Sequence, residues 1–205
     1  MNLQFTLNGN FVALDVEEDA SLLHVLREQC GLTSLKNGCA PQGQCGCCLA
    51  LVDGQAKVTC AMPARKAFGK SVTTLEGLSE ADRTTYALAF VATGGLQCGF
   101  CTPGIVLRTH HLLQHNPNPD HDAIAKALDV HLCRCTGYNR IIRAVEVLAE
   151  HRQRGTPIVP AATDGGVGAS LARVDGTRLV LGTRPFVDDL LRANQLFGAV
   201  RLADH

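Results

Sequence analysis

The sequence has no tryptophan and no excess of charge of either sign. Two tyrosines and seven phenylalanines among 205 residues are too few to build a surface on which nucleic-acid bases stack. The 19 basic and 19 acidic residues give a formal net charge of zero, which argues against a nucleic-acid or membrane surface. No window approaches a membrane span of about eighteen apolar residues. The first residues also lack the charged start and apolar run of a secretory signal, so we expect a cytoplasmic protein.

Motifs of common active sites are also missing. There is no Ser/His/Asp set, no phosphate-binding loop and no dinucleotide fingerprint, so we assign no catalytic residue and expect no direct substrate binding. The eight histidines do not require a metal site. His110, His111 and His115 fall on one predicted helix, where a solvated face is the simpler interpretation. Asp188 and Asp189 suggest only a surface turn.

Cysteine, in contrast, is abundant: there are ten, and all lie before residue 136. Without an export signal, clustered thiols indicate metal ligands rather than disulfides. The stretch "NGCAPQGQCGCCLALVDGQAKVTC", residues 37–60, holds five, whereas an iron–sulfur cluster or a tetrahedral zinc takes four. Plant-type 2Fe–2S sites follow C-x4-C-x2-C with a distant fourth cysteine. With a first gap one residue longer, that order is matched by Cys39, Cys45, Cys48 and Cys60.

Four further cysteines form the pairs Cys98-x2-Cys101 and Cys133-x-Cys135. Each pair comes just before a predicted helix, whose free N–H groups and positive partial charge favour an anionic cluster. Taken alone, this spacing is equally open to zinc, and a zinc-stabilised assembly module without redox activity is the alternative for the chain. Both sets already have four members, so His131 is not needed as a ligand.

The remaining pattern divides the chain into three parts. In residues 1–76, apolar and polar residues alternate around Asn-Gly at 8–9 and Asp-Gly at 53–54, which predicts two hairpins. One short helix is predicted between them, and Cys30 at its end is expected to be a small buried apolar residue. Residues 77–154 contain four stretches of helical spacing, which predicts a compact bundle. Residues 155–205 begin as a linker, and alternation around Asp-Gly at 175–176 predicts a third hairpin.

Three motifs resemble those of a known family. The stretches "GCAPQGQCGCC", "GGLQCGFCTPG" and "HLCRCTGYNRI" look like the iron–sulfur subunit or domain of the molybdenum hydroxylases, the xanthine dehydrogenase and aldehyde oxidase family. The resemblance covers about residues 1–153 and implies an α+β chain, with a plant-type ferredoxin-like (β-grasp) domain followed by a four-helix domain. It implies one 2Fe–2S cluster in each domain. The ligands would be Cys39, Cys45, Cys48 and Cys60 in the first, and Cys98, Cys101, Cys133 and Cys135 in the second.

The resemblance also implies partners. In such proteins electrons pass from a molybdopterin-type molybdenum cofactor, in a molybdenum-binding large subunit, through both clusters to FAD in a medium subunit. A dimer of such heteromers is expected. Gln97 matches a residue that contacts the pterin, and Cys135 matches a ligand close to it. The first expectation for the substrate is xanthine, with aldehydes or other N-heterocycles as alternatives; a stand-alone two-cluster ferredoxin is a further one.

Two features depart from the family pattern. The first gap is longer, and Cys47 stands where the family more often has a small residue such as alanine. That slot and the plant-type C-x2-C step make Cys47 the spare cysteine, so we predict that Cys48 faces the iron and Cys47 does not. The last 40 or so residues resemble, more weakly, the opening of the family's molybdenum-binding subunit, with a private extension as the alternative. We expect this tail to pack on a large partner.

Overall fold

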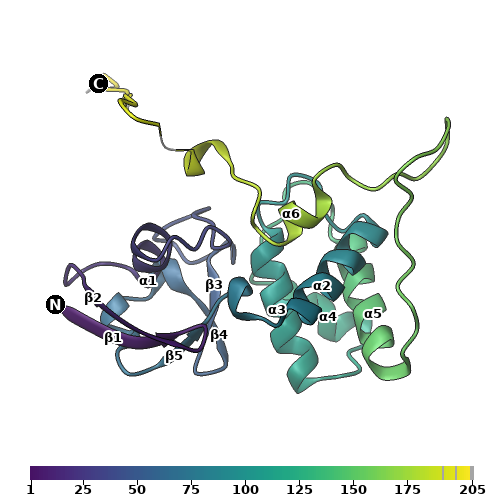
Figure 1. Ribbon diagram of the computed structural model, residues 1–205, viewed down its shortest axis with the longest axis horizontal. Coiled ribbons are helices and arrows are strands. Elements are labelled where there is room, and N and C mark those ends of the chain that lie inside the picture. Colours follow the sequence, from purple (N-terminus) through teal and green to yellow (C-terminus); the bar gives the residue numbers. More distant parts are fainter. Residues whose placement is uncertain (191, 197, 204–205) are drawn as a thin grey trace.

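The computed structural model describes residues 1–190, 192–196 and 198–203. A small sheet with short helical turns comes first, a helical unit follows it, and the remaining residues run back over both (Figure 1). The predicted α+β class is confirmed. Among the described residues, no helix has the length and apolar character needed to cross a bilayer.

The sheet has the strand order β2-β1-β5-β3-β4. Its strands are β1 (Asn2–Leu7), β2 (Asn10–Asp15), β3 (Leu49–Val52), β4 (Gln55–Val58) and β5 (Ser71–Thr73). Both predicted hairpins are present: β1 pairs antiparallel with β2, and β3 with β4. Their turns contain Asn8 and Asp53 at φ of 51° and 49°, each followed by a glycine at positive φ, as two-residue hairpin turns require.

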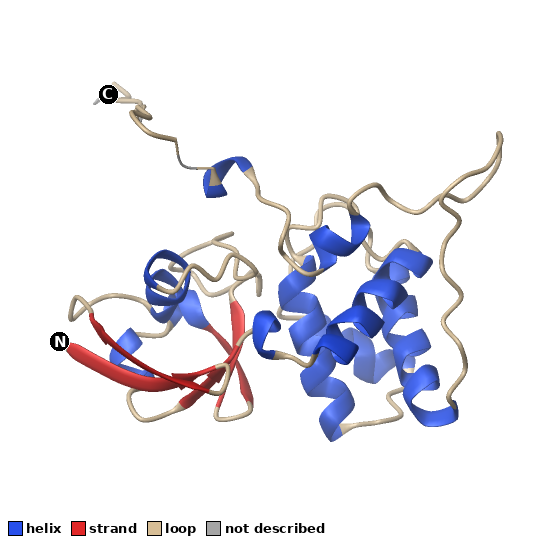
Figure 2. Ribbon diagram, in the orientation of Figure 1, coloured by secondary structure: helices blue, strands red, loops and turns tan. Residues whose placement is uncertain are grey.

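One helical segment covers a face of this sheet (Figure 2). It consists of α1 (Leu22–His24), which continues directly into the π-helical turn η1 (Val25–Gln29). The Ser21 hydroxyl caps it by accepting the His24 N–H at 3.2 Å. Its apolar residues pack on Leu3 and Phe5 of β1 in one core. Cys30 lies partly buried at the edge of that core, and burial raises the pKa of its thiol, so the expected apolar role fits.

The predicted helices of the second unit are all present. They are α2 (Glu80–Thr93), α3 (Thr102–His115), α4 (His121–Leu128) and α5 (Asn139–Arg154). Their ends follow local chemistry: the hydroxyl of Ser79 and the carboxylate of Asp120 accept N–H groups of the first turns of α2 and α4, and α2 ends at Gly94 with φ of 67°. Three short turns also occur before α2: η2 (Thr59–Ala61), η3 (Ala64–Ala67) and η4 (Leu75–Gly77).

The prediction of a solvated histidine face on α3 is wrong for one residue. His110 is 8% exposed, and its Nδ1 lies 3.0 Å from the hydroxyl of the buried Tyr86 on α2. Burial lowers the pKa of His110. Neighbouring helix positions point about 100° apart, so His110 faces α2 while His111 stacks on His115, with ring centroids 4.3 Å apart.

The third predicted hairpin is also wrong. Asp175, at φ of 58°, precedes the helix α6 (Gly176–Val180), whose Leu179 and Val180 are buried against the helical unit. An Asp-Gly pair supplies positive φ to a helix start as readily as to a hairpin, and here apolar burial on α2 and α3 selects the helix.

Asp189 likewise does not lie on an open surface turn. It ends the turn η5 (Val187–Asp189), and its side chain is 3% exposed and pairs with Arg27 and Lys36. The segment from α6 to Asp189 therefore packs on this chain's own units.

Candidate metal centres

The first cysteine loop, residues 37–48, leads into β3. It has no regular secondary structure and is held by single backbone bonds, such as Lys36 N–H to the Cys47 carbonyl at 3.0 Å. Cys60 comes from the turn η2, directly after β4. The Thr59 hydroxyl donates to the Cys48 carbonyl at 2.7 Å, so the β3–β4 hairpin carries the distant fourth cysteine back to the loop.

Within the first set, the cysteines lie in pairs. The Cys39 Sγ accepts the Cys45 N–H at 3.3 Å, and the Cys48 Sγ accepts the Cys60 N–H at 3.4 Å. Burial by itself would raise the pKa of Cys39, but donors from Gln44, Cys45 and the loop backbone outweigh it and lower the pKa. Burial and the neighbouring Cys48 raise the pKa of Cys60 to about 12. The first set thus contains one sulfur whose surroundings shift its ionisation toward the thiolate.

Cys47 lies beside Cys45 of the first set. It is 4% exposed, its Sγ contacts the Cys45 carbonyl at 3.6 Å, and it lines a cavity together with Cys45 and with Cys98, Cys101 and other residues of the helical unit. Burial is the main cause that raises the pKa of its thiol. Cys48, in contrast, is packed in the core of the sheet unit. The two adjacent sulfurs therefore face different units.

The second set gathers at the starts of two helices. Cys101 is the N-cap residue of α3, and Cys133 and Cys135 stand in the loop before α5. The Cys98 and Cys135 sulfurs lie 3.6 Å apart, and the buried Cys101 and Cys133 thiols lie close enough to shift each other's pKa. Burial would raise the pKa of Cys133, but its contact with the Thr136 hydroxyl, at 3.1 Å, and nearby N–H groups lower it.

The two cysteine loops touch each other. Leu132 N–H donates to the Cys45 carbonyl at 3.0 Å. A Cβ added at Gly46 would lie 2.5 Å from the His131 Nδ1, and one added at Gly104 would lie 2.5 Å from the Gly46 carbonyl oxygen. Gly46, at φ of 68°, is thus enclosed between the loop before Cys133 and the first turn of α3. These two glycines allow the backbones of the two units to meet between the cysteine sets.

The cysteine pairs fit metal coordination. Two thiolates on one tetrahedral metal, at about 2.3 Å from it, lie about 3.8 Å apart, close to the 3.6 Å between the Cys98 and Cys135 sulfurs. A 2Fe–2S cluster needs two such pairs, one for each iron. Each set offers two pairs. In the described part of the chain, no group of three or more Cys, His, Asp or Glu side chains is placed so that it could hold a single metal ion.

Comparisons with known proteins agree with this chemistry. Residues 5–75 match a family described as a 2Fe–2S iron–sulfur cluster binding domain, and residues 74–146 match one described as a 2Fe–2S binding domain. The nicotinate dehydrogenase small FeS subunit of Eubacterium barkeri is 39% identical over 151 residues, which are 73% of this chain and 96% of that protein. The chain belongs to the iron–sulfur subunits of the molybdenum hydroxylases. Members of this family bind 2Fe–2S clusters and work with a molybdenum cofactor and FAD in partner subunits.

Two further relatives show how much of the chain is shared. A probable xanthine dehydrogenase subunit of Bacillus subtilis strain 168 is 37% identical over 69% of this chain and 81% of its own length. The crystal structure of the aldehyde oxidoreductase from Desulfovibrio desulfuricans ATCC 27774 superposes with a TM-score of 0.83 and 32% identity. That match covers 92% of this chain but only 22% of the oxidoreductase chain, so this iron–sulfur chain corresponds to about a fifth of that protein.

Gln97 lies where a partner can reach it. Its side chain is exposed and donates from Nε2 to the Cys135 carbonyl at 2.8 Å. Cys98 and Cys135 are exposed too, whereas Cys101 and Cys133 are buried. The second cysteine set therefore has one open edge, and Gln97 stands on it.

Sequence reasoning missed Tyr138 beside the second set, and it considered His131 only as a possible ligand. The Tyr138 hydroxyl accepts the Cys133 N–H at 2.8 Å and donates to the His131 carbonyl at 2.9 Å. His131 is 3% exposed, neither ring nitrogen has a hydrogen-bond partner among the described residues, and burial, with Arg108 nearby, lowers its pKa to about 3. Only the nearness of both residues to the Cys133 motif pointed to them.

Proposed function

We propose that this chain is the electron-transfer component of a molybdenum hydroxylase, carrying electrons between a molybdenum-binding partner and an FAD-binding partner. When bound, two 2Fe–2S clusters supply one-electron transfer. The observation that carries the proposal is the arrangement of eight cysteines as four pairs, two in each unit, at a direct contact between the units. We place the domain boundary between residues 76 and 77, with a plant-type ferredoxin-like domain before it and a four-helix domain after it.

The pairs support the ligand sets that we propose. In the first domain, Cys39 with Cys45 and Cys48 with Cys60 would each hold one iron. In the second, Cys98 with Cys135 and Cys101 with Cys133 would do so. Hydrogen bonds to sulfur and burial are the protein's means of setting a cluster potential. The N–H donors on Cys39 and the hydroxyl of Thr136 beside Cys133 act in this way, since both stabilise negative charge on sulfur.

The open edge of the second set supports a direction for the proposed transfer. Gln97 and Cys135 lie on the exposed side of that set, and we propose that the molybdenum cofactor of the large subunit is seated there, next to the Gln97 side-chain amide. The first set would then serve the FAD-binding medium subunit, in a complex that we expect to be a dimer of heteromers.

The substrate would be oxidised in the large partner, since we assign no catalytic residue in this chain. Xanthine is the first substrate to test, because one relative's name includes xanthine dehydrogenase. Nicotinate and aldehydes follow, because they appear in the names of the other two relatives. Oxidation of each by the purified complex, followed by dye reduction, would decide among them.

Metal analysis of the natively purified chain tests the electron-transfer role. Two 2Fe–2S clusters predict about four irons per chain and two distinct electron paramagnetic resonance signals after anaerobic reduction. Cys60→Ser should remove one signal and Cys101→Ser the other, with about two irons lost each time. A colourless chain loaded with zinc would overturn the proposal in favour of a zinc-stabilised module. Repeated isolation without molybdenum or flavin subunits would favour a stand-alone ferredoxin.

A further inference from the structure

The tail crosses the boundary between the two units on its own chain. After the exposed linker, α6 buries Leu179 at 3% exposure, and a Cβ added at Gly99 would lie 2.7 Å from the Leu179 Cβ. Gly182 then passes so close that an added Cβ would lie 2.6 Å from the Ser34 Cα and 3.2 Å from Pro103. Ser34 belongs to the first unit and Pro103 to the second, so the tail contacts both at one point.

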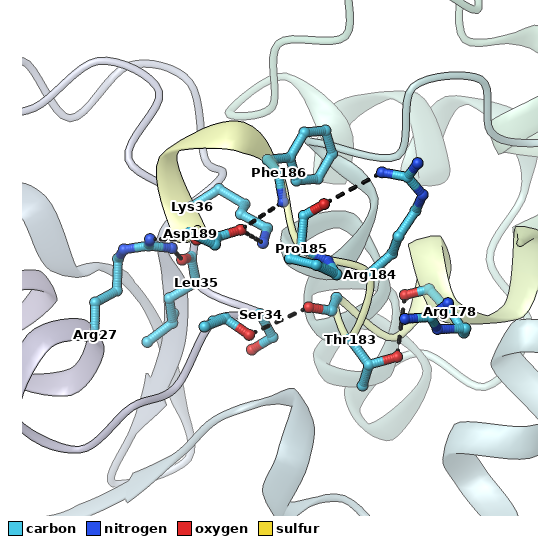
Figure 3. A network of polar contacts seen from close by, with 12 residues as sticks. Arg27, Ser34, Leu35, Lys36, Arg178, Thr183, Arg184, Pro185, Phe186 and Asp189 are labelled. Atoms are coloured by element: carbon cyan, nitrogen blue, oxygen red, sulfur yellow. Dashed lines mark hydrogen bonds and ion pairs between the residues drawn. The ribbon is translucent and has the colours of Figure 1, made fainter. Parts of the chain in front are cut away.

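The tail reaches a buried ion-pair network (Figure 3). One Asp189 carboxylate oxygen lies 2.7 Å from the Arg27 guanidinium and the other 3.2 Å from the Lys36 Nζ. The exposed fractions of these side chains are 3% for Asp189, 2% for Lys36 and 10% for Arg27. The Asp189 carboxylate also accepts the Phe186 N–H at 2.9 Å. With the tail in place, both cations face this carboxylate, and buried charges are stable only with such partners.

An aromatic contact completes the site. The Phe186 ring meets Phe100 edge to face, with centroids 5.3 Å apart, and lies under the Lys36 ammonium at 5.0 Å. Phe100 stands between Cys98 and Cys101, and Lys36 is three residues before Cys39. The site is thus built from residues next to both cysteine sets.

We propose that Arg27, Lys36 and Phe100 form a docking site for a segment that presents an aromatic residue three positions before a carboxylate, here Phe186 and Asp189. The segment from residue 176 to 189 occupies it through its own contacts and needs no covalent link to the preceding linker. The linker, exposed from residue 162 to 171, acts only as a tether. The site therefore binds the polypeptide segment that follows the iron–sulfur domains. Docking fixes the path of this segment past the two cysteine sets.

The two kinds of relative support a separable segment. The Eubacterium barkeri protein is almost fully matched by 73% of this chain, whereas the longer aldehyde oxidoreductase matches 92% of it. Most of the tail thus has a structural counterpart where the polypeptide is longer. Docking of the tail depends neither on bound clusters nor on the proposed electron transfer.

Cleaving the linker tests whether the tail remains bound to the rest of the chain without a covalent link. A site-specific protease sequence inserted after Gly166 in the full chain allows cleavage at an exposed position. We expect the fragment from residue 167 onward to co-elute with the remainder on gel filtration. Asp189→Asn should weaken its retention at least about thirtyfold, because it removes the carboxylate charge that faces both buried cations. Asp188→Asn is the matched control, since Asp188 is exposed, and should change nothing.

Two results would overturn the proposal. One is release of the wild-type fragment as soon as the tether is cut; the other is equal retention for the Asp188 and Asp189 variants. Arg27→Gln combined with Asp189→Asn should weaken retention little more than either change alone, which separates a specific pair from general disruption. The visible absorption of each uncut variant checks that the cysteine sites are intact, so a failed docking site and a failed electron carrier give different results.

Discussion

At the scale of single residues, two adjacent cysteines have different surroundings. Cys48 packs in the sheet core and its sulfur accepts the Cys60 N–H, whereas Cys47 packs in the core of the helical unit. The alternation of β3 continues from them: Leu49 lies in the same core as Cys47, and Ala50 in the same core as Cys48. Cys45 lies in the same core as Cys47, so the two cores do not decide between the adjacent cysteines. The hydrogen bond from the Cys60 N–H to the Cys48 sulfur favours Cys48 as the ligand.

Replacing each of these cysteines should therefore have different results. Cys47→Ala should leave about four irons per chain and both resonance signals, because its sulfur is not in a ligand pair. Cys48→Ala should reduce iron to about two per chain and remove one signal. Iron analysis with resonance spectroscopy checks both variants together. Loss of a signal in Cys47→Ala would reverse the assignment.

His110 predicts a pH dependence of stability. Unfolded histidine titrates near pH 6.5, and burial lowers the pKa of His110 in the fold, with Asp82 and Arg152 nearby acting in opposite directions. The unfolded chain therefore binds more protons just below about pH 6.5, so stability present above that pH is lost as the pH falls, by at most about 1.4 kcal/mol per pH unit.

The variant His110→Asn should flatten this dependence, because asparagine does not titrate and still offers an acceptor to the Tyr86 hydroxyl. Urea unfolding between about pH 7.5 and 5.5 measures it. His24→Gln, at an exposed position, should keep the wild-type slope. An unchanged slope in His110→Asn would show that His110 does not stay neutral in the fold. His131, which is also buried, contributes its own share in all three proteins.

At the scale of elements, the contact between the first turn of α3 and the first cysteine loop sets how close the two cysteine sets come. Gly104 touches the Gly46 carbonyl, and Gly46 touches His131. The atoms that an added Cβ would meet at both positions include backbone oxygens, which cannot rotate away as a side chain does. Any larger residue must push the units apart.

Gly104→Ala tests this contact. We expect a loss of about 1–3 kcal/mol in the free energy of unfolding from overpacking, together with a weaker magnetic interaction between the two reduced clusters. Denaturant titration measures the first, and resonance line splitting the second. Gly166→Ala makes the same chemical change in open space and should alter neither. An unchanged splitting in Gly104→Ala would mean that another contact sets the separation.

At the scale of the whole molecule, the regular elements and the cysteine loops depend on different forces. One apolar core lies within the sheet unit, and a second joins the four long helices to residues of β3. Residues 37–48 and 131–138, in contrast, form no helix or strand, and they carry five of the eight proposed ligands: Cys39, Cys45, Cys48, Cys133 and Cys135. Without metal, thiols brought together in such loops have only a few backbone bonds to hold them.

Removing iron should therefore make the two cysteine loops more mobile, while the sheet and the long helices stay folded. After chelation, we expect faster hydrogen exchange in residues 37–48 and 131–138, while far-ultraviolet circular dichroism changes little because the sheet and the long helices persist. Exchange in α2, which carries none of the proposed ligands, provides the internal control. Collapse of the whole dichroism spectrum on chelation would show that the clusters, and not the apolar cores, hold the fold.

Much of this protein is determined by its sequence alone. The Asn-Gly and Asp-Gly turns at residues 8–9 and 53–54 and the helical apolar periods of residues 77–154 are local signals, and each produced the expected hairpin or helix. Cysteine spacing predicted the two sets because ligands near each other in a loop are near each other in space.

Only the tertiary structure decided the rest, because it depends on contacts between residues far apart in the chain. The pairing of Cys98 with Cys135, the burial of His110 beside Tyr86, and the helix at 176–180 all arise from packing between elements. Asp189 is the clearest case. Its sequence neighbours predict a solvated turn, yet its carboxylate is buried in contact with Arg27 and Lys36, which lie more than 150 residues earlier in the chain. A buried charge needs an opposite charge, and no local pattern shows where that partner lies.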